Sequence, residues 1–357
     1  MIPIVEDNIF TNPFYHRSVR WEVSNGESYM AELRREPVTR MWVVVTNDHP
    51  KGPSDYLPFK PPYQLQEQED PCPFCPGNEG MTPQETFSLS RDGGRWTVRV
   101  IPNKFPFFHI EGDFDRRPEG MYDVMDAIGA HEIVVESPEH HQSLSTMEPK
   151  QIGKILLAYK ERLIDLEKDH RFQQFLILKN YPGIFNHHPH SHILAMPVIP
   201  KRIDEEIWGA LDYYQRKERC IFCDIIKEEI SMKKRVILET VFFLIFSPFA
   251  SRYPFETWII PKVHSPDFHR IREEEIRDLS IGIQSLFHRF SKLLPDPPYS
   301  LTFHTSPGQG RFHRPEYHWH IETRLRIGLR EGFEWGTGFF VNPTPPEDAA
   351  SYLRGVE

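Results

Sequence analysis

The sequence lacks four features that would each indicate a class of function. It has no run of about 18 apolar residues, the length that spans a membrane, and no basic segment leading into an apolar one at its N-terminus. It has no long basic run to offset its net charge of −9, and no P-loop or GxGxxG turn. We therefore expect a soluble, cytoplasmic protein that binds neither membranes nor nucleic acid.

Cysteine is also scarce. The four cysteines form two CxxC pairs, Cys72 with Cys75 and Cys220 with Cys223. Without an export signal, such pairs are typical of reduced thiols that bind metal rather than of disulfides. A thioredoxin-like redox pair is the alternative, but two pairs that each precede several histidines fit it poorly.

Histidine, by contrast, is abundant, with 18 residues in 357, and it concentrates in the stretch 186–192. Side chains alternate between the two faces of an extended segment, so His188, His190 and His192 are expected on one face of a strand. A solvated histidine-rich loop is the alternative interpretation. The strongly apolar run that follows, 193–200, favours the strand.

The chain repeats one order of elements. A CxxC pair, two strands, a histidine, a helix, a further strand and an HxH motif occur in that order before and after residue 200. The same offset of 12 residues separates His140 from Ile152 and His264 from Ile276, both in predicted helices. We predict strands at 41–46, 96–101, 131–136, 174–179, 236–246, 257–261 and 299–304, and helices at 147–168 and 272–294. Ser145 and Glu148 are expected to form a capping box at the start of the first helix.

This order predicts an α+β fold of two duplicated half-units, each an antiparallel sheet with a covering helix. The first half is expected to span 31–200 with the active HxHxH motif. The second is expected to span 218–345 with the second CxxC pair, and 201–217 is expected to link them.

Two structural zinc sites follow from the repeat. Zinc suits two thiolates and two imidazoles in a tetrahedron. Four protein ligands leave no open position, so both sites are expected to be structural. The predicted ligands are Cys72, Cys75, His140 and His188 in the first half and Cys220, Cys223, His264 and His318 in the second.

The remaining histidines of the motif are the candidate catalytic residues. With His188 fixed on a metal, His190 would have a defined ring orientation, and a backbone carbonyl holding its Nδ1–H would present Nε2 as a nucleophile. Attack on an α-phosphorus would give a covalent nucleotidyl-histidine and divide one displacement into two steps. His192 would donate a proton or hydrogen bond to the phosphate or the leaving oxygen.

The motif 188–192 resembles the HxHxH motif of the histidine-triad superfamily, which implies that both half-units are histidine-triad-like. More narrowly, the segments 72–75, 137–140, 188–190, 254–264 and 298–304 resemble those of the galactose-1-phosphate uridylyltransferase family. The resemblance implies a half-barrel sheet in each half and a homodimer whose active site includes partner residues. It places Asn103 and Phe105 near the nucleotide base and ribose, and Asn180 near the ribose or phosphate.

Several residues depart from that family. His192 stands where the family has glutamine, as in the hydrolysing branches of the superfamily, and the loop between Asn180 and the motif is shorter. The arginines that follow the first strand are replaced, which leaves Lys51 as a candidate phosphate ligand. The second CxxC pair and the segments 102–106 and 336–343 are more similar to plant ADP-glucose phosphorylase, a relative with two zincs that transfers AMP.

We therefore hypothesise an enzyme that moves a nucleoside monophosphate from a nucleotide sugar to a hexose 1-phosphate. A nucleotide-sugar phosphorylase, a dinucleoside polyphosphate hydrolase and a non-catalytic, zinc-stabilised nucleotide-binding protein are the alternatives. His320 corresponds to His190 and is expected to bind phosphate or to be a relic. His304 with Glu205 or Glu206 is a weak candidate metal site.

Overall fold

The computed structural model describes residues 30–59, 71–90, 94–183, 187–308, 314–328 and 332–356. Its centre is a ten-stranded sheet in which all neighbouring strands are antiparallel. In spatial order the strands are β10 (Val236–Glu239), β11 (Phe243–Phe246), β12 (Thr257–Pro261), β14 (His320–Leu325), β13 (Tyr299–His304), β8 (Gln174–Tyr181), β9 (His190–Met196), β7 (Ala130–Val135), β4 (Trp96–Pro102) and β3 (Phe87–Ser90).

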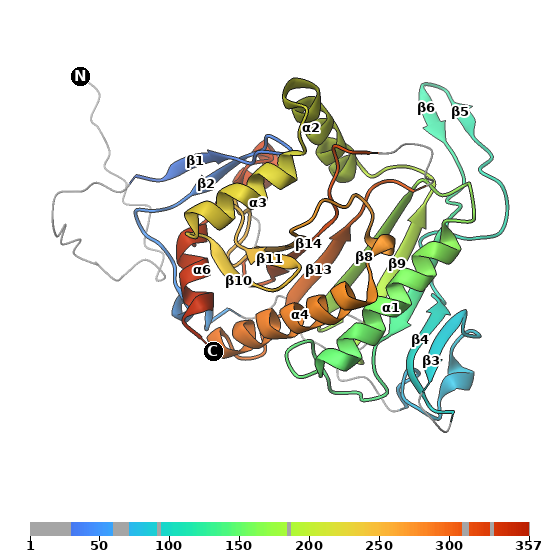
Figure 1. Cartoon of the computed structure of the whole chain (residues 1–357). Coiled ribbons are helices and arrows are strands. Elements are labelled where there is room, and N and C mark those ends of the chain that lie inside the picture. Colours follow the sequence, from blue (N-terminus) through green and yellow to red (C-terminus); the bar gives the residue numbers. More distant parts are fainter. Residues whose placement is uncertain are drawn as a thin grey trace, which may run out of the picture.

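The sheet consists of two halves with matching strand order. From the middle outward, β8, β9, β7, β4 and β3 correspond to β13, β14, β12, β11 and β10. The halves join where β8 pairs with β13, with Tyr181 opposite Tyr299. Helices α1 (Pro149–Leu166) and α4 (Glu273–Leu293) lie side by side across one face (Figure 1). The predicted α+β class is confirmed, and the matched order agrees with a duplication.

The other face of the sheet differs between the halves. In the second half, helices α2 (Lys201–Lys217) and α3 (Ile221–Met232) cover it, and their apolar side chains form one core with those of β11 and β12. In the first half, the same face carries the histidine motif and lines a cavity. Residues 201–217, expected to be a linker, are therefore a packed helix, and the second CxxC pair lies at the start of another.

Three local predictions were wrong. The apolar run 236–246 is a hairpin, β10–β11, because Asp278 of α4 accepts hydrogen bonds from Thr240 and Phe242 at a turn. Helix α1 begins after Glu148, whose side chain makes no capping hydrogen bond, so the expected Ser145–Glu148 capping box does not form. Strand β9 begins at His190, so His188 precedes it.

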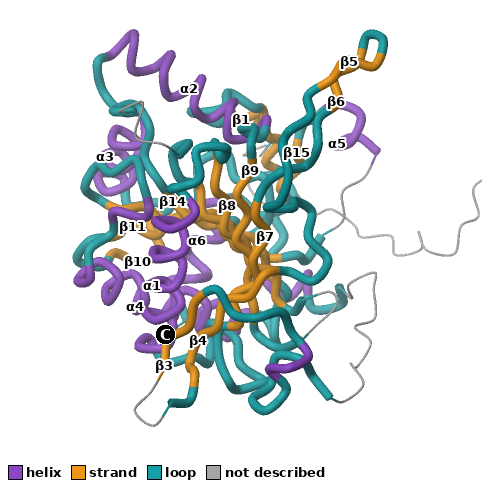
Figure 2. The backbone as a smooth tube through the Cα atoms, turned by 90° about the vertical axis from the view of Figure 1, so that its right-hand side faces the viewer, coloured by secondary structure: helices purple, strands orange, loops and turns teal. Residues whose placement is uncertain are grey.

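A smaller sheet joins the two ends of the described chain. Strand β2 (Trp42–Val45) pairs antiparallel with β1 (Glu32–Arg35) and parallel with β15 (Phe340–Asn342). Helices α5 (Gly332–Thr337) and α6 (Pro346–Arg354) flank β15, and a hairpin of β5 (Arg117–Glu119) and β6 (Tyr122–Val124) projects from the molecule in both views (Figures 1 and 2). Within the described ranges, no helix is long and apolar enough to cross a membrane.

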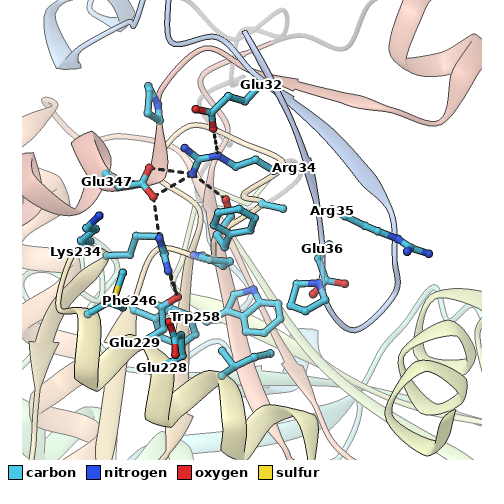
Figure 3. Close-up of a pocket in the computed structure, with 18 of the residues that line it drawn as sticks. Glu32, Arg34, Arg35, Glu36, Glu228, Glu229, Lys234, Phe246, Trp258 and Glu347 are labelled. Atoms are coloured by element: carbon cyan, nitrogen blue, oxygen red, sulfur yellow. Dashed lines mark hydrogen bonds and ion pairs between the residues drawn. The ribbon is translucent and has the colours of Figure 1, made fainter. Parts of the chain in front are cut away.

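A cavity of about 1280 Å³ lies between β1, α3 and α6 (Figure 3). Two arginines of its lining form ion pairs with lining carboxylates. Arg34 donates to Glu32 and Glu347, and Arg235 donates to Glu347 and Glu229. These ion pairs connect strand β1 to helix α6, and both elements are distant in sequence from the histidine motif.

Candidate functional site

Strand β9 places the histidine motif between two neighbours. It pairs with β7 on one side and β8 on the other, and its residues alternate between the two faces of the sheet. Ser191 and Ile193 face the helices, whereas His190 and His192 line a cavity of about 670 Å³ on the opposite face. The two imidazole rings lie 5.2 Å apart, so both can contact one bound phosphoryl group.

The orientation of the His190 ring is set by its backbone. Its Nδ1 lies 2.7 Å from the His188 carbonyl oxygen, which can only accept, so Nδ1 carries the proton and Nε2 keeps its lone pair. Burial lowers the pKa of His190 to about 4, although the hydrogen bond to the carbonyl opposes this shift. The ring is therefore neutral near pH 7, as a nucleophile requires.

A buried ion pair contacts the start of strand β9. Lys179 of β8 donates to Glu136 at 2.6 Å and to the His190 carbonyl oxygen at 3.3 Å. The Tyr159 hydroxyl of α1 lies 2.7 Å from Ser191 Oγ and 3.2 Å from Glu136. These bonds hold the His190 carbonyl and the Ser191 side chain in place, and the Lys179 charge helps to keep the His190 ring unprotonated.

The cavity contains most of the residues predicted to bind the nucleotide. Asn103, Phe105 and Asn180 all line it. Ser300 of β13 donates to Asn180 Oδ1 at 2.7 Å, which leaves the Asn180 amide hydrogens for another acceptor. Phe105 is 79% exposed at the mouth, where a flat base could stack on it.

Lys51 does not join this group. Its backbone N–H donates to the Pro343 carbonyl beside the small sheet, and it is not among the residues that line the histidine cavity. The sequence prediction that Lys51 contacts phosphate is therefore not met within one chain. The shortened loop before the motif includes residues 184–186, which lie outside the described residues.

The first predicted metal site is assembled. Its four ligand atoms lie within 4.8 Å of one another. Cys75 Sγ is 3.3 Å from His140 Nδ1 and 3.6 Å from His188 Nδ1, and the two Nδ1 atoms are 3.4 Å apart. Zn–N bonds of about 2.0 Å and Zn–S bonds of about 2.3 Å in a tetrahedron require ligand separations of about 3.3–3.8 Å. The cluster matches that geometry.

The second site repeats the first. Cys223 Sγ lies 3.5 Å from His264 Nδ1 and 3.7 Å from His318 Nδ1. In both sites the histidine of the HxH motif uses its Nε2–H elsewhere, since His188 donates to the Ser137 carbonyl and His318 to the Pro261 carbonyl. This outer hydrogen bond leaves Nδ1 for a metal. A hydrogen bond from Cys220 lowers the pKa of Cys223, which favours the thiolate.

His320, the second-half counterpart of His190, is buried under other side chains. His320 repeats the carbonyl hydrogen bond of His190, with Nδ1 3.1 Å from the His318 carbonyl oxygen. Its ring is fully buried against Phe222 and Trp258, at centroid distances of 5.2 and 4.8 Å, and its Nε2 has no hydrogen-bond partner among the described residues. A ring in this position cannot reach a nucleotide.

A third group, Glu206, His304, His320 and Glu322, also has the arrangement of a metal site. In this group, protein side chains and not a metal ion supply the positive charge next to the two carboxylates. Arg252 donates to Glu322 at 2.8 Å. Burial alone would lower the pKa of His304, but Glu206 and Glu322 raise it to about 9, so its ring is protonated at neutral pH.

One contact of the cavity was missed at the sequence level. His131 of β7 lies 3.0 Å, Nε2 to Nδ1, from His192. The only signal in the sequence was its place in a predicted strand, alternating with the apolar Ile133. The pairing of β7 with β9 brings the two rings together across 61 residues of sequence.

Two family models cover most of the chain. Residues 22–200 match the N-terminal domain of galactose-1-phosphate uridyl transferase, and residues 209–328 match the C-terminal domain. ADP-glucose phosphorylase of Arabidopsis thaliana is 34% identical over 92% of this chain and 94% of its own. Galactose-1-phosphate uridylyltransferase of Thermotoga maritima is 28% identical over 92% of this chain and 99% of its own.

The fold is shared with solved structures. The crystal structure of the Arabidopsis thaliana ADP-glucose phosphorylase with bound ADP-glucose superimposes with a TM-score of 0.77. It is 32% identical and covers 92% of this chain and 99% of that one. A GALT-like protein from the same plant superimposes with a TM-score of 0.76 at 33% identity, covering 91% of this chain and 99% of that one.

Proposed function

Because the chain belongs to the galactose-1-phosphate uridylyltransferase family, we propose that it transfers a nucleoside monophosphate from a nucleotide sugar through a covalent intermediate on His190. It is a nucleotidyltransferase of that type. The observation that carries the assignment of His190 is the 2.7 Å hydrogen bond from its Nδ1–H to a backbone carbonyl, which presents Nε2 to the cavity.

The proposed reaction has two balanced steps. The His190 Nε2 lone pair forms a P–N bond to the α-phosphorus, and the P–O bond to the sugar phosphate breaks. The sugar 1-phosphate leaves with the bonding electrons. In the second step an oxygen of the acceptor attacks the same phosphorus and restores the neutral imidazole. Asn180 donates to the phosphate or ribose, and Asn103 and Phe105 contact the base.

Inorganic phosphate is the first candidate acceptor, with ADP-glucose as donor. An ADP-glucose phosphorylase of Arabidopsis thaliana is 34% identical, and the crystal structure of an ADP-glucose phosphorylase from that plant contains ADP-glucose. A hexose 1-phosphate with UDP-glucose is the second candidate, supported by the Thermotoga maritima uridylyltransferase.

Two structural zinc ions and a homodimer complete the proposal. Zinc is supported by the ligand separations at both Cys₂His₂ clusters. The homodimer is supported by the family resemblance, and Lys51 would then contact phosphate in the cavity of the partner subunit. Light scattering on the purified chain tests the dimer.

A cytoplasmic location rests on the four cysteines, none of which forms a disulfide.

The covalent step is tested by trapping. The protein is incubated with ADP-glucose or UDP-glucose labelled at the α-phosphorus, and acid-labile label on the chain is counted. We expect about one label per chain, none on a His190→Asn variant, and full label on a His320→Asn variant, the matched control in the closed half. Full labelling of His190→Asn would exclude the mechanism. Adding phosphate or galactose 1-phosphate to the labelled protein then identifies the acceptor.

A further inference from the structure

His131 has no part in the mechanism above, yet it faces the same cavity as the two motif histidines. The Phe107 ring lies 4.8 Å from its ring, and burial lowers its pKa to about 4. Its Nε2 points at His192 Nδ1 across 3.0 Å. Burial also lowers the pKa of His192 to about 4, so both rings are neutral near pH 7 and each carries one N–H.

The position of each proton follows from a backbone donor. The Phe107 N–H donates to His131 Nδ1 at 3.2 Å, so that nitrogen is an acceptor. The single proton of His131 is then on Nε2 and is donated to His192 Nδ1. His192 must therefore carry its own proton on Nε2.

The nearby Asn103 side chain does not alter this assignment. Its Oδ1 accepts from the Phe105 N–H, which fixes the amide orientation. Its Nδ2 is 3.3 Å from His131 Nδ1 and 3.1 Å from Nε2. Because these two distances are nearly equal, the Asn103 amide does not point along the in-plane direction of either ring nitrogen. The in-plane hydrogen bonds of His131 are therefore those with the Phe107 N–H and with His192 Nδ1.

We propose that His131 is a positioning residue that fixes His192 as a hydrogen-bond donor toward the cavity and denies it the lone pair needed to act as a base toward water. This inference rests on the proposed covalent intermediate. An unconstrained histidine can present either N–H or a lone pair at Nε2. The side-chain amide of glutamine, the family residue at this position, provides a donor without titrating. The His131 hydrogen bond gives His192 the same donor character.

The consequence concerns the acceptor. Water attacking a nucleotidyl-histidine requires a base to take its proton, whereas a phosphate oxygen is already ionised and requires none. With Nε2 of His192 protonated, the intermediate should persist in water and react with a phosphate-bearing acceptor. The histidine at position 192 is therefore compatible with a transferase, although it resembles that of the hydrolysing branches.

Partition of the labelled intermediate tests the effect. Labelled protein is divided between buffer alone and buffer with phosphate or galactose 1-phosphate, and the ratio of hydrolysis to transfer is measured. We expect His131→Leu to raise this ratio at least about tenfold, since a freed base contributes on that scale or more. His131→Gln, whose amide can still donate to His192 Nδ1, should restore a ratio close to that of the wild type.

A variant that cannot change tautomer provides the control. In a His192→Gln background, His131→Leu should leave the ratio unchanged. Equal slowing of both reactions, or the same rise in the His192→Gln background, would overturn the proposal. The tautomer is also measured without turnover, by two-bond ¹⁵N–¹H correlation on histidine-labelled protein, with His192 assigned by its loss in His192→Gln.

The tautomer measurement separates the two proposals. A proton on His192 Nε2 in the wild type, redistributed in His131→Leu, supports the positioning of His192 whether or not the protein turns over. A proton on Nδ1 in the wild type refutes it. Absence of label from any nucleotide sugar would count against the covalent mechanism alone.

Discussion

The buried ion pair beneath His190 makes the sharpest stability prediction. Lys179 and Glu136 have side-chain exposures of 2% and 0%, and their N–O distance is 2.6 Å. Lys179→Met would leave the Glu136 carboxylate buried without its cation, which typically costs about 3–5 kcal/mol. Because the Tyr159 hydroxyl still lies 3.2 Å from that carboxylate, we expect a loss of about 3 kcal/mol in the free energy of unfolding.

Urea unfolding of the metal-loaded protein, followed by circular dichroism, measures this loss. Lys168→Met is the matched control, because Lys168 is 73% exposed in its ion pair with Asp165 and should contribute less than about 1 kcal/mol. A Lys179→Met/Glu136→Gln double variant should recover at least about 2 kcal/mol relative to the sum of the single changes. Additive losses, or a Lys179→Met loss as small as the control, would refute the reasoning.

Three further results are expected. Elemental analysis should find about two zinc ions per chain, and Cys72→Ser and Cys220→Ser should each lower that number to about one; three ions would instead mean that the Glu206 cluster binds metal. Ser300→Ala should lower kcat/KM about fivefold, because the Asn180 side chain loses the hydrogen bond that orients its amide, and one hydrogen bond contributes about 1 kcal/mol. Thr302→Ala, on the same strand, should leave kcat/KM unchanged. The free energy of unfolding should fall as the pH drops from about 6.5 to 4. In the unfolded state His131 binds a proton near pH 6.5, but in the folded state it does so only near pH 4, so protonation favours unfolding across this range. The midpoint of urea unfolding should therefore depend less steeply on pH in His131→Gln than in the wild type.

Periodicity and spacing were sufficient to predict the repeat. The helices expected at 147–168 and 272–294 are observed as Pro149–Leu166 and Glu273–Leu293. Apolar residues at helical spacing specify a buried face whatever packs on it, which explains this success. The two Cys₂His₂ groups were also predictable, because the order of ligands along the chain limits which residues can meet.

Contacts between distant strands were not predictable in this way. The contact between His131 and His192 depends on the register of β7 against β9, which no local pattern encodes. The α3 helix was not predicted, although residues 221–232 contain no proline or glycine. Closure of the second site depends on this helix, since Phe222 packs against His320.

The pairing of β8 with β13 also has a consequence for how the chain is made. During synthesis β8 emerges well before β13, with residues 182–298 between them. Until then, the nascent first half ends in a bare edge strand beside the strand that carries His190, and such an edge is a template for pairing with other chains. Expressing the halves as separate polypeptides would make that transient state permanent.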